Sequence, residues 1–262
     1  MNIEIIQSGL FTAYGNAYIN GKDVSFDKNH PMGYNYRNIK FLRKIPELEP
    51  LSKLDLIADN PNEWFKYLKA NKFSRLYLSY DLSTHPKLKD HIGAAFVGGG
   101  SQWNILAEKD ETYDLWKIVN KTERGENMTY YHLILENTDL GVLKFPSLET
   151  SKLYLKEILS DLVKFTLKSE LPNWLNVFQK AIDYLSNENP KELIDENILP
   201  SECYSLEAKQ ILTACDQAWV FGGIGSWNDV VNVYDYNLYN RLTANLYDSV
   251  CKAFVSAINS YP

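Results

Sequence analysis

The sequence is poor in cysteine: among 262 residues only Cys203, Cys215 and Cys251 occur. Their number is odd, all three lie in the C-terminal third, and none is spaced as Cys-x-x-Cys. A reducing cytosolic compartment is the simplest explanation of this usage. Cys215 also falls on a predicted apolar helical face, where a thiol behaves as a small hydrophobic group.

The chain also lacks a long apolar run. No stretch approaches the roughly 18 uninterrupted apolar residues that are needed to cross a bilayer. The segment from Met1 to Ser8 has no basic region followed by an apolar one, so it does not resemble a signal peptide. We therefore expect a cytoplasmic protein without a membrane segment.

An excess of basic residues is missing as well. The net charge is -6: residues 1–150 carry 18 basic and 19 acidic side chains, whereas residues 151–262 carry 9 and 14. A C-terminal half this acidic repels nucleic-acid phosphates, which bind through Lys and Arg. It suits a basic partner instead, and nucleic acid is not an expected partner.

Common catalytic and cofactor motifs are absent too. No Gly-Lys-Ser/Thr follows the glycine cluster at residues 222–225, which excludes a P-loop. The cluster is not a dinucleotide-binding fingerprint either, because it lacks the third glycine and follows a predicted helix instead of a strand. No Gly-x-Ser-x-Gly nucleophile elbow occurs. Of the histidines His30, His85, His91 and His132, only His85 and His91 could form a metal site, with Asp81 or Asp90. Their spacing is irregular, so we expect no metal and no cofactor.

Aromatic side chains, by contrast, are abundant: the chain has 18 Tyr, 11 Phe and 6 Trp. Hydrophobic residues make up 45% and charged residues 23%, as in an ordinary folded protein. We expect most of the aromatic residues in the core. Those that stay partly exposed would make good binding anchors.

Strand patterns dominate the first half of the chain. Asn20-Gly21 lies between two short β-rich runs and predicts a hairpin within residues 17–26. Further predicted strands are residues 75–80, the pair 92–97 and 102–108 around Gly98-Gly99-Gly100, and the pair 115–119 and 129–135 around a turn at 122–127. One helix interrupts this set at about residues 62–71, with Asn60 as N-cap, Pro61 at its first position and Glu63 as the capping partner.

After Pro146 the apolar period becomes helical. Helices are predicted to start at Ser147, Pro172, Ser205 and Asp235, the last running to about Ser260. Strands followed by helices predict an α+β fold, with a mostly antiparallel sheet in the N-terminal half and a helical C-terminal half packed against it. We divide the chain into a mainly β subdomain with one helix, residues 1–146, and a helical subdomain, residues 147–262, which share an interface.

The most informative segment runs from Asp216 to Asp229, where a helical pattern meets a glycine cluster and then four polar or aromatic residues. We call residues 219–229 the Gly-Trp loop. If it recognises a ligand or partner, the binding residues are Asp216, Trp219, Gly222, Gly223, Gly225, Ser226, Trp227, Asn228 and Asp229. If it is structural, Gly222 ends the helix, Trp227 fills the core, and Asn228 or Asp229 forms a turn. At least one of the three glycines should have a positive φ.

Residues 97–103 repeat the loop's pattern of an apolar residue, Gly-Gly and a later Trp, which we attribute to coincidence. Two groups of acidic residues are a second candidate binding feature, because they would attract a basic partner if they are not simply solvated. One group is Asp110, Glu111 and Asp114; the other is Glu188, Glu192, Asp195, Glu196 and Glu202.

The segment from Trp219 to Asp229, preceded by a helix with Leu206-Glu-Ala and followed by a Tyr-rich helix, resembles a group of uncharacterised bacterial proteins over the chain from about Trp174 onward. Some proteins of this size and style resemble immunity proteins of bacterial toxin systems. The resemblance implies a non-enzymatic cytoplasmic binding protein that blocks a toxin domain, with a protein as partner and no transferred catalytic residues. The alternative is a small-molecule-binding protein or enzyme with a pocket at residues 222–229.

Overall fold

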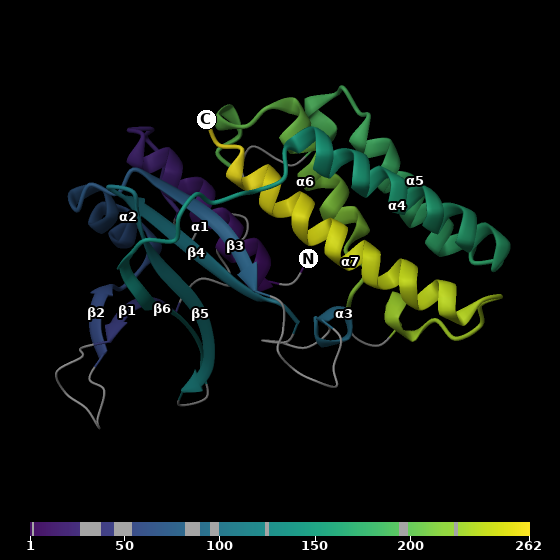
Figure 1. The fold of residues 1–262 in the computed structure, drawn as a ribbon, viewed down its shortest axis with the longest axis horizontal. Helices are drawn as coiled ribbons and strands as arrows, with labels where there is room; N and C mark the ends of the chain where they lie inside the picture. Colours follow the sequence, from purple (N-terminus) through teal and green to yellow (C-terminus); the bar gives the residue numbers. More distant parts are fainter. Residues whose placement is uncertain are drawn as a thin grey trace.

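A computed structural model of the chain describes residues 1, 3–26, 38–44, 54–81, 90–94, 100–123, 126–193, 199–222 and 225–262. Within these residues the protein is α+β, as expected, with a six-stranded sheet in the N-terminal half. Four long helices follow it: α4 (Leu148–Lys168), α5 (Pro172–Leu185), α6 (Leu206–Ala218) and α7 (Tyr236–Asn259). Figure 1 shows the sheet on one side of the molecule and these helices on the other.

The sheet has the strand order β2-β1-β6-β5-β4-β3. Its described strands are β1 (Ile39–Lys44), β2 (Leu54–Ala58), β3 (Arg75–Asp81), β4 (Gln102–Lys109), β5 (Thr112–Glu123) and β6 (Glu126–Thr138). The β1–β6 pairing is parallel, whereas the other pairings among these strands are antiparallel. The sheet is therefore mixed, and the predicted β5–β6 hairpin is confirmed.

The expected hairpin of residues 92–97 with 102–108 is wrong. Residues 90–93 form the short helix α3 (Asp90–Gly93), and residues 95–97 lie outside the described part of the chain. β4 is a strand as predicted, but its neighbours are β3 and β5. The described part of residues 92–97 therefore contributes no hairpin strand to β4.

The predicted helix starts are confirmed at their caps. In α2 (Pro61–Ala70), the Asn60 side chain accepts a hydrogen bond from the backbone N–H of Glu63 at 3.0 Å. Ser147, Ser205 and Asp235 do the same for the third backbone N–H of α4, α6 and α7. A side-chain oxygen at the N-cap satisfies an otherwise unpaired donor, which is why these residue types mark helix starts so well.

The hairpin expected at Asn20-Gly21 is also wrong, because residues before it form the helix α1 (Ile3–Ile19). Gly21, with φ of 80°, ends this helix: its N–H bonds to the carbonyl of Tyr18, and the N–H of Lys22 bonds to the carbonyl of Ala17. These two bonds form a Schellman motif. The described part of residues 1–146 therefore contains α1, α2 and α3, rather than one helix.

The helices α1 and α2 cover one face of the sheet. Phe11 of α1 packs on Tyr131 and Phe41, and Trp64 of α2 stacks on Phe41 at 4.4 Å and meets Trp116 edge-on. α1 approaches the sheet so closely that a Cβ on Gly15 would lie 2.3 Å from Leu76 Cδ1. We call this the covered face of the sheet.

The outer edge of β3 is closed by two asparagine side chains. Asn16 of α1 donates to the carbonyl of Leu76 at 2.9 Å and accepts from its N–H at 2.7 Å. Asn259, at the end of α7, makes the same pair of bonds with Leu78, at 2.9 and 2.7 Å. An exposed strand edge invites pairing with other chains, and these amides occupy its free backbone groups.

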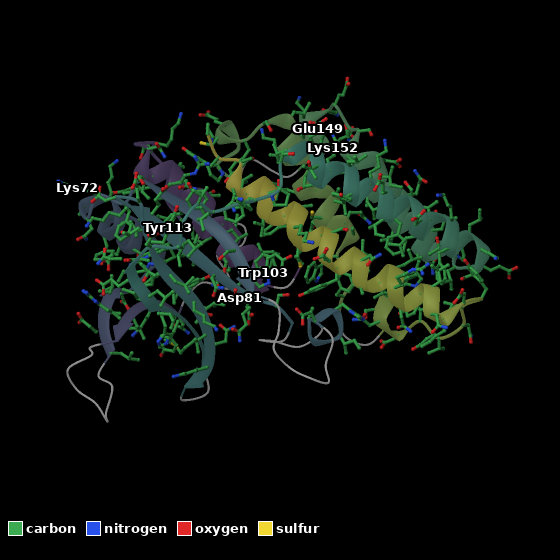
Figure 2. The ribbon with its side chains drawn as sticks, viewed as in Figure 1. Lys72, Asp81, Trp103, Tyr113, Glu149 and Lys152 are labelled. Carbon is green, nitrogen blue, oxygen red and sulfur yellow. The ribbon has the colours of Figure 1, made fainter. Side chains whose placement is uncertain are left out.

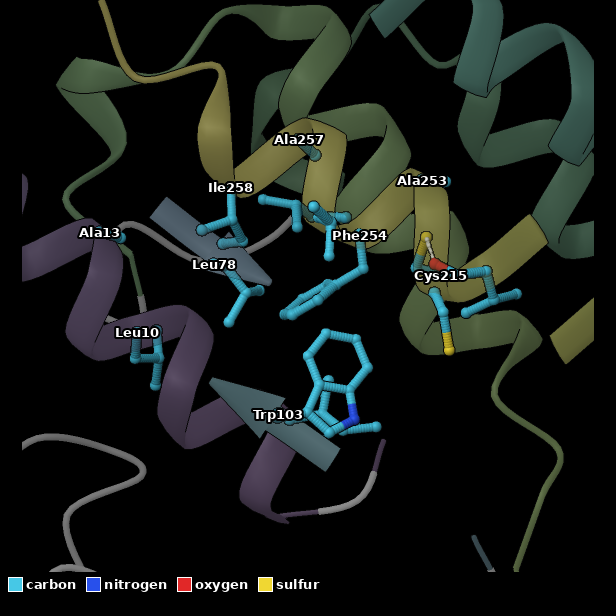
Figure 3. Packing of buried hydrophobic residues seen from close by; sticks show 14 of the residues in the cluster. Leu10, Ala13, Leu78, Trp103, Cys215, Ala253, Phe254, Ala257 and Ile258 are labelled. Atoms are coloured by element: carbon cyan, nitrogen blue, oxygen red, sulfur yellow. Dashed lines mark hydrogen bonds between the residues drawn. The ribbon is translucent and has the colours of Figure 1, made fainter. Parts of the chain in front are cut away.

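α7 joins the sheet to the helices. Figure 3 shows Trp103 of β4 against Phe254 of α7, near Leu10 of α1 and Leu78 of β3; the two aromatic rings meet edge-on with centroids 6.0 Å apart. On its other sides α7 packs against α4 and α6, and the buried apolar residues of both halves form one continuous core. The division at residue 146 stays a prediction. None of the described helices is long and apolar enough to cross a membrane.

Candidate functional site

Trp227, at the centre of the Gly-Trp loop, is completely buried. Its ring contacts Phe165 of α4, Trp174 and Phe178 of α5, and Tyr239 of α7. The indole N–H donates to Thr243 Oγ1 at 2.8 Å, and the Tyr239 hydroxyl donates to the Trp227 carbonyl. Trp227 therefore fills the core between three helices, as the structural interpretation of the loop predicted, and fixes the loop to the bundle.

The start of the loop is held by α7 as well. Phe221 is buried and meets the Tyr247 ring at 5.1 Å, and the half-buried Trp219 meets it at 5.7 Å. α6 ends at Ala218 with Trp219, at φ of -75°, as its C-cap. The expectation that Gly222 caps this helix is therefore wrong, because the chain leaves α6 before it reaches the glycines.

Of the described glycines in the loop, Gly222 is half-buried and Gly225 is exposed. Gly225 has φ of 84°, which confirms the expected positive value, and its N–H donates to Asp229 Oδ2 at 2.7 Å. Ser226 Oγ donates to the Gly222 carbonyl at 3.1 Å. Gly223 lies outside the described residues. Asp229 is exposed and closes a small turn, so the loop's last carboxylate has a local structural partner and also faces solvent.

Asp216 lies on α6, before the Gly-Trp loop begins. Its exposed carboxylate forms an ion pair with the N-terminal amine of Met1 at 3.2 Å. The side chain lies on α6 and ties the start of the chain to the bundle. Of the binding residues proposed from the sequence, Asp216 thus has an ion-pair partner outside the loop.

Asn228 connects the loop to α3. Its Nδ2 donates to the carbonyl of His91 at 2.9 Å, while its Oδ1 is buried and has no hydrogen-bond partner among the described residues. His91 is itself buried and lies 6.4 Å from Phe221, ring centre to ring centre. The loop therefore packs on α3 with one acceptor left unsatisfied.

The two sequence segments with the shared Gly-Gly-Trp pattern meet at Tyr247. From one segment, Phe221 packs on the Tyr247 ring. From the other, the N–H of Ser101 donates to the Tyr247 hydroxyl at 3.2 Å. A Cβ on Gly100 would lie 3.0 Å from that hydroxyl oxygen. The pattern was attributed to coincidence, and the structure nevertheless brings both copies against one tyrosine.

A chain of hydrogen bonds begins at this tyrosine. Tyr247 OH donates to Ser101 Oγ at 3.2 Å, and Ser101 Oγ donates to Asp90 Oδ2 at 2.9 Å. Burial raises the pKa of the Tyr247 phenol, with a further contribution from Cys251, and burial also raises the pKa of the Cys251 thiol. At neutral pH both groups keep their protons, so the chain offers hydrogen-bond donors rather than a thiolate or phenolate nucleophile.

Ser101 and Tyr247 were not identified from the sequence, and Asp90 was considered only as a possible metal ligand. Ser101 directly follows the glycines of residues 98–100, which was the only signal available for it. Tyr247 matches the apolar stripe of a helix, and nothing in that pattern distinguishes it from a core residue. Cys215 behaves as predicted: it is buried, burial raises the pKa of its thiol, and Sγ contacts the Val250 carbonyl at 3.6 Å.

Immediately after the loop, the chain exposes apolar and aromatic side chains. Val231 is 76% exposed, Tyr236 58% and Tyr234 44%, and Leu167 at the end of α4 is 66% exposed. The Lys168 ammonium lies 4.1 Å from the centre of the Tyr234 ring. We call these five residues the bundle-end surface.

The acidic groups differ in exposure. Asp110 and Glu111 form the two-residue turn between β4 and β5 with φ of 49° and 63°, whereas Asp114 is buried and accepts a bond from the N–H of Asn137 at 2.8 Å. Burial raises the pKa of Asp114, against the effect of that bond. Asp114 is therefore not part of an acidic surface. In the second group Glu188, Glu192 and Glu202 are exposed, and Asp195 and Glu196 lie outside the described residues.

Two of the cavities lined by described residues are a pocket and a groove, and neither of these two is lined by the Gly-Trp loop. A pocket of about 510 Å³ lies where the β6–α4 connection crosses the sheet, with Tyr77, Glu108, Glu111, Tyr113 and Asp139 in its wall. A groove of about 300 Å³ between α4 and α7 is lined by Tyr154, Glu157, Asp161 and Asp248, among others.

The metal site that the sequence offered as an alternative, at His85 and His91 with Asp81 or Asp90, lies partly outside the described residues. His85 and His30 lie outside the described residues, whereas Asp90 is bonded to Ser101 and Asp81 to Asn104. Within the described part of the chain, no group of three or more His, Cys, Asp or Glu side chains could hold a metal ion.

Comparisons with protein-family models, curated proteins and solved structures give no match to this chain. Its function must therefore be inferred from its own geometry.

Proposed function

We propose that this chain is a cytoplasmic binding protein, of the kind that neutralises a bacterial toxin domain, and that the bundle-end surface contacts the partner. The observation that carries the proposal is the exposure of Val231, Tyr234 and Tyr236 in a single short segment. Solvent-facing tyrosines beside aliphatic residues are typical of the residues that dominate binding energy in protein interfaces.

The tyrosines rest on a rigid base, which favours binding. Tyr234 packs on Phe165 at 5.1 Å, and Tyr236 stacks on Tyr239 at 5.7 Å. Phe165 and Tyr239 in turn contact the buried Trp227. Because these side chains are already held, little conformational entropy is lost when a partner covers them. In this interpretation the Gly-Trp loop supports the binding surface, and the exposed residues follow it.

The charge of the C-terminal half favours a basic partner. Besides the excess of acidic residues, the groove between α4 and α7 carries Glu157, Asp161 and Asp248. Tyr154 in its wall is 60% exposed and the neighbouring Leu153 55%. Long-range attraction of this type raises the association rate and weakens with salt. We therefore expect the association rate to fall as the ionic strength increases.

The test first asks whether a reading frame beside the gene of this protein encodes a toxin domain, as the proposal expects, and then uses that domain as the partner. Tyr236→Ala and Val231→Ala should each weaken binding by about 1 to 2 kcal/mol, as truncation of interface anchors commonly does, and should reduce protection of cells that express the toxin. Val142→Ala is the matched control, since Val142 is 85% exposed but lies on the β6–α4 connection. Unchanged binding by both bundle-end variants, at unchanged melting temperature, would refute the proposed surface.

The alternative, a ligand site or active site at residues 222–229, is favoured by one observation. The unsatisfied Oδ1 of Asn228 lies close to the hydrogen-bonded chain of Tyr247, Ser101 and Asp90, because Asn228 bonds to His91 next to Asp90. If this cluster binds a small molecule, Asn228→Leu should abolish function while the bundle-end variants remain active. The protection assay therefore separates the two proposals.

A further inference from the structure

The face of the sheet opposite α1 and α2 carries a row of polar side chains. The register places Ser79 of β3 beside Asn104 of β4, Asn104 beside Lys117 of β5, and Lys117 beside His132 of β6. Residues that are directly paired point to the same face, and their neighbours Leu78, Ile105, Trp116 and Tyr131 face the other way, toward the covered face. We call these four residues the polar row.

The Asn104 side chain is fixed by one hydrogen bond, but its amide oxygen has no hydrogen-bond partner among the described residues. It is 2% exposed, and its Nδ2 donates to Asp81 Oδ2 at 3.0 Å. Figure 2 shows Asp81 and Trp103 close together, at the end of the sheet away from Tyr113. The bond to Asp81 fixes the amide plane, and Oδ1 then has no hydrogen-bond partner among the described residues. Native proteins rarely bury such an acceptor without a partner of some kind.

His132 shows the same deficiency on the other side of Lys117. Its Nε2 is buried and has no partner within the described part of the chain. Burial, and then the charge of Lys121, lower the pKa of His132, so the imidazole is neutral at pH 7 and carries one N–H. Asn104 Oδ1 and His132 Nε2, which both lack a hydrogen-bond partner among the described residues, therefore lie on either side of Lys117.

Lys117, between these two residues, carries a positive charge that no described carboxylate pairs with. The lysines and arginine that form ion pairs among the described residues are Lys40, Arg43, Lys152, Lys164 and Lys252, and Lys117 is not one of them. The row thus offers an ammonium, a hydroxyl and an imidazole as donors, with one amide oxygen as acceptor. Two buried apolar residues lie on the same face beside the row: Leu42, which is paired with His132, and Leu106, two positions after Asn104.

We propose that the polar row binds a small organic oxyanion that also carries a hydroxyl group. The anion is held by Lys117 with a bond from His132, and the ligand's hydroxyl donates to Asn104 Oδ1. The requirement for a donor follows from the orphaned oxygen, since a plain anion would satisfy Lys117 and leave Asn104 unpaired. This site is independent of the bundle-end surface and goes beyond the proposed function.

Two probes test the requirement directly: glycolate, which has a carboxylate and an adjacent hydroxyl, and acetate, which lacks the hydroxyl. Each is titrated into the full chain while the Cε1 proton of His132 is followed by NMR. We expect saturable shifts, with glycolate binding about ten-fold more tightly than acetate, the worth of one well-formed hydrogen bond. No saturable shift with glycolate, or equal affinities for the two probes, would overturn the proposal.

Variants assign the roles within the row. Lys117→Met should abolish saturation by both probes, whereas Lys66→Met, an equal charge change at an exposed position of α2, should leave both titrations unchanged. Asn104→Leu should reduce the preference for glycolate to less than about two-fold while acetate still binds. A preference that survives Asn104→Leu would exclude Asn104 from the site. If that variant does not fold, the Lys117→Met and Lys66→Met pair still decides whether the row binds the anion.

Discussion

The edge of β3 and the polar row both contain buried asparagines, but the hydrogen bonding of their side-chain amides differs. At the edge, Asn16 and Asn259 each donate one hydrogen bond and accept one, so the amides and the strand are both satisfied. In the row, Asn104 donates to Asp81 and its oxygen accepts nothing from the described residues. All three asparagines are buried, so burial alone does not separate them.

The difference shows what a buried asparagine contributes. A fully paired amide stabilises the fold, because removing it would orphan the backbone groups that it serves. A half-paired amide gives the fold little, so its presence in the core needs another explanation, such as a ligand. Asn228 in the Gly-Trp loop belongs with Asn104, because it too bonds through Nδ2 alone.

The largest effect is expected at the strand edge. Asn16→Ala should lower the free energy of unfolding by about 2 to 5 kcal/mol, because both backbone groups of the fully buried Leu76 lose their partners. Alanine favours a helix at this position, so the loss cannot come from helix propensity. Asn259→Ala should behave alike through Leu78. Urea denaturation measures both.

Asn245→Ala, at an exposed position of α7, is the control for this pair and should change the free energy of unfolding by less than about 0.5 kcal/mol. If Asn16→Ala is as stable as the control, the edge bonds do not stabilise the protein and the contrast with Asn104 disappears.

Much of the fold follows from the sequence where local signals are strong. The helices of the second half have a side-chain N-cap or an N-terminal proline and a clear apolar stripe, and all were predicted from these features. α1 was missed because it is buried almost all round, so its sequence has no polar face to reveal the helical period. The same Asn20-Gly21 pair that suggests a hairpin also ends a helix, and local sequence does not decide between them.

The candidate sites depend on contacts between distant segments. Trp227 and Gly225 were recognisable because glycines and tryptophan lie together in the sequence. Ser101 and Tyr247, by contrast, meet across 146 positions of chain. The polar row requires the register of four strands, and the parallel β1–β6 pairing could not be inferred without knowing which strands are neighbours. Such long-range pairing leaves no local trace in a single sequence.

The next largest effect is expected in the Gly-Trp loop, where Gly225 has a positive φ and Gly222 does not. Gly225→Ala should lower the free energy of unfolding by about 1 kcal/mol, because an alanine at φ of 84° is strained although no atom lies within 4 Å of its Cβ. Gly222→Ala should be tolerated, since its φ is not positive and a Cβ there would meet only Ser226 Cβ, at 3.6 Å. Thermal unfolding of the two variants, side by side, gives the difference. Equal melting temperatures would show that the loop relaxes around Gly225.

The smallest change in the free energy of unfolding is expected for Asn104→Leu. This variant tests the comparison between fully paired and half-paired asparagines most directly. Asn104→Leu replaces the amide with an apolar group of similar size, which removes an unsatisfied acceptor but also breaks the bond to the exposed Asp81 carboxylate. These terms oppose each other, so we expect the free energy of unfolding to change by less than about 1 kcal/mol. The same urea titration applied to Asn16→Ala and Asn104→Leu compares a paired with a half-paired amide. A loss at Asn104 as large as that at Asn16 would mean that its oxygen is satisfied within the fold, and the polar row would then be a structural element rather than a ligand site.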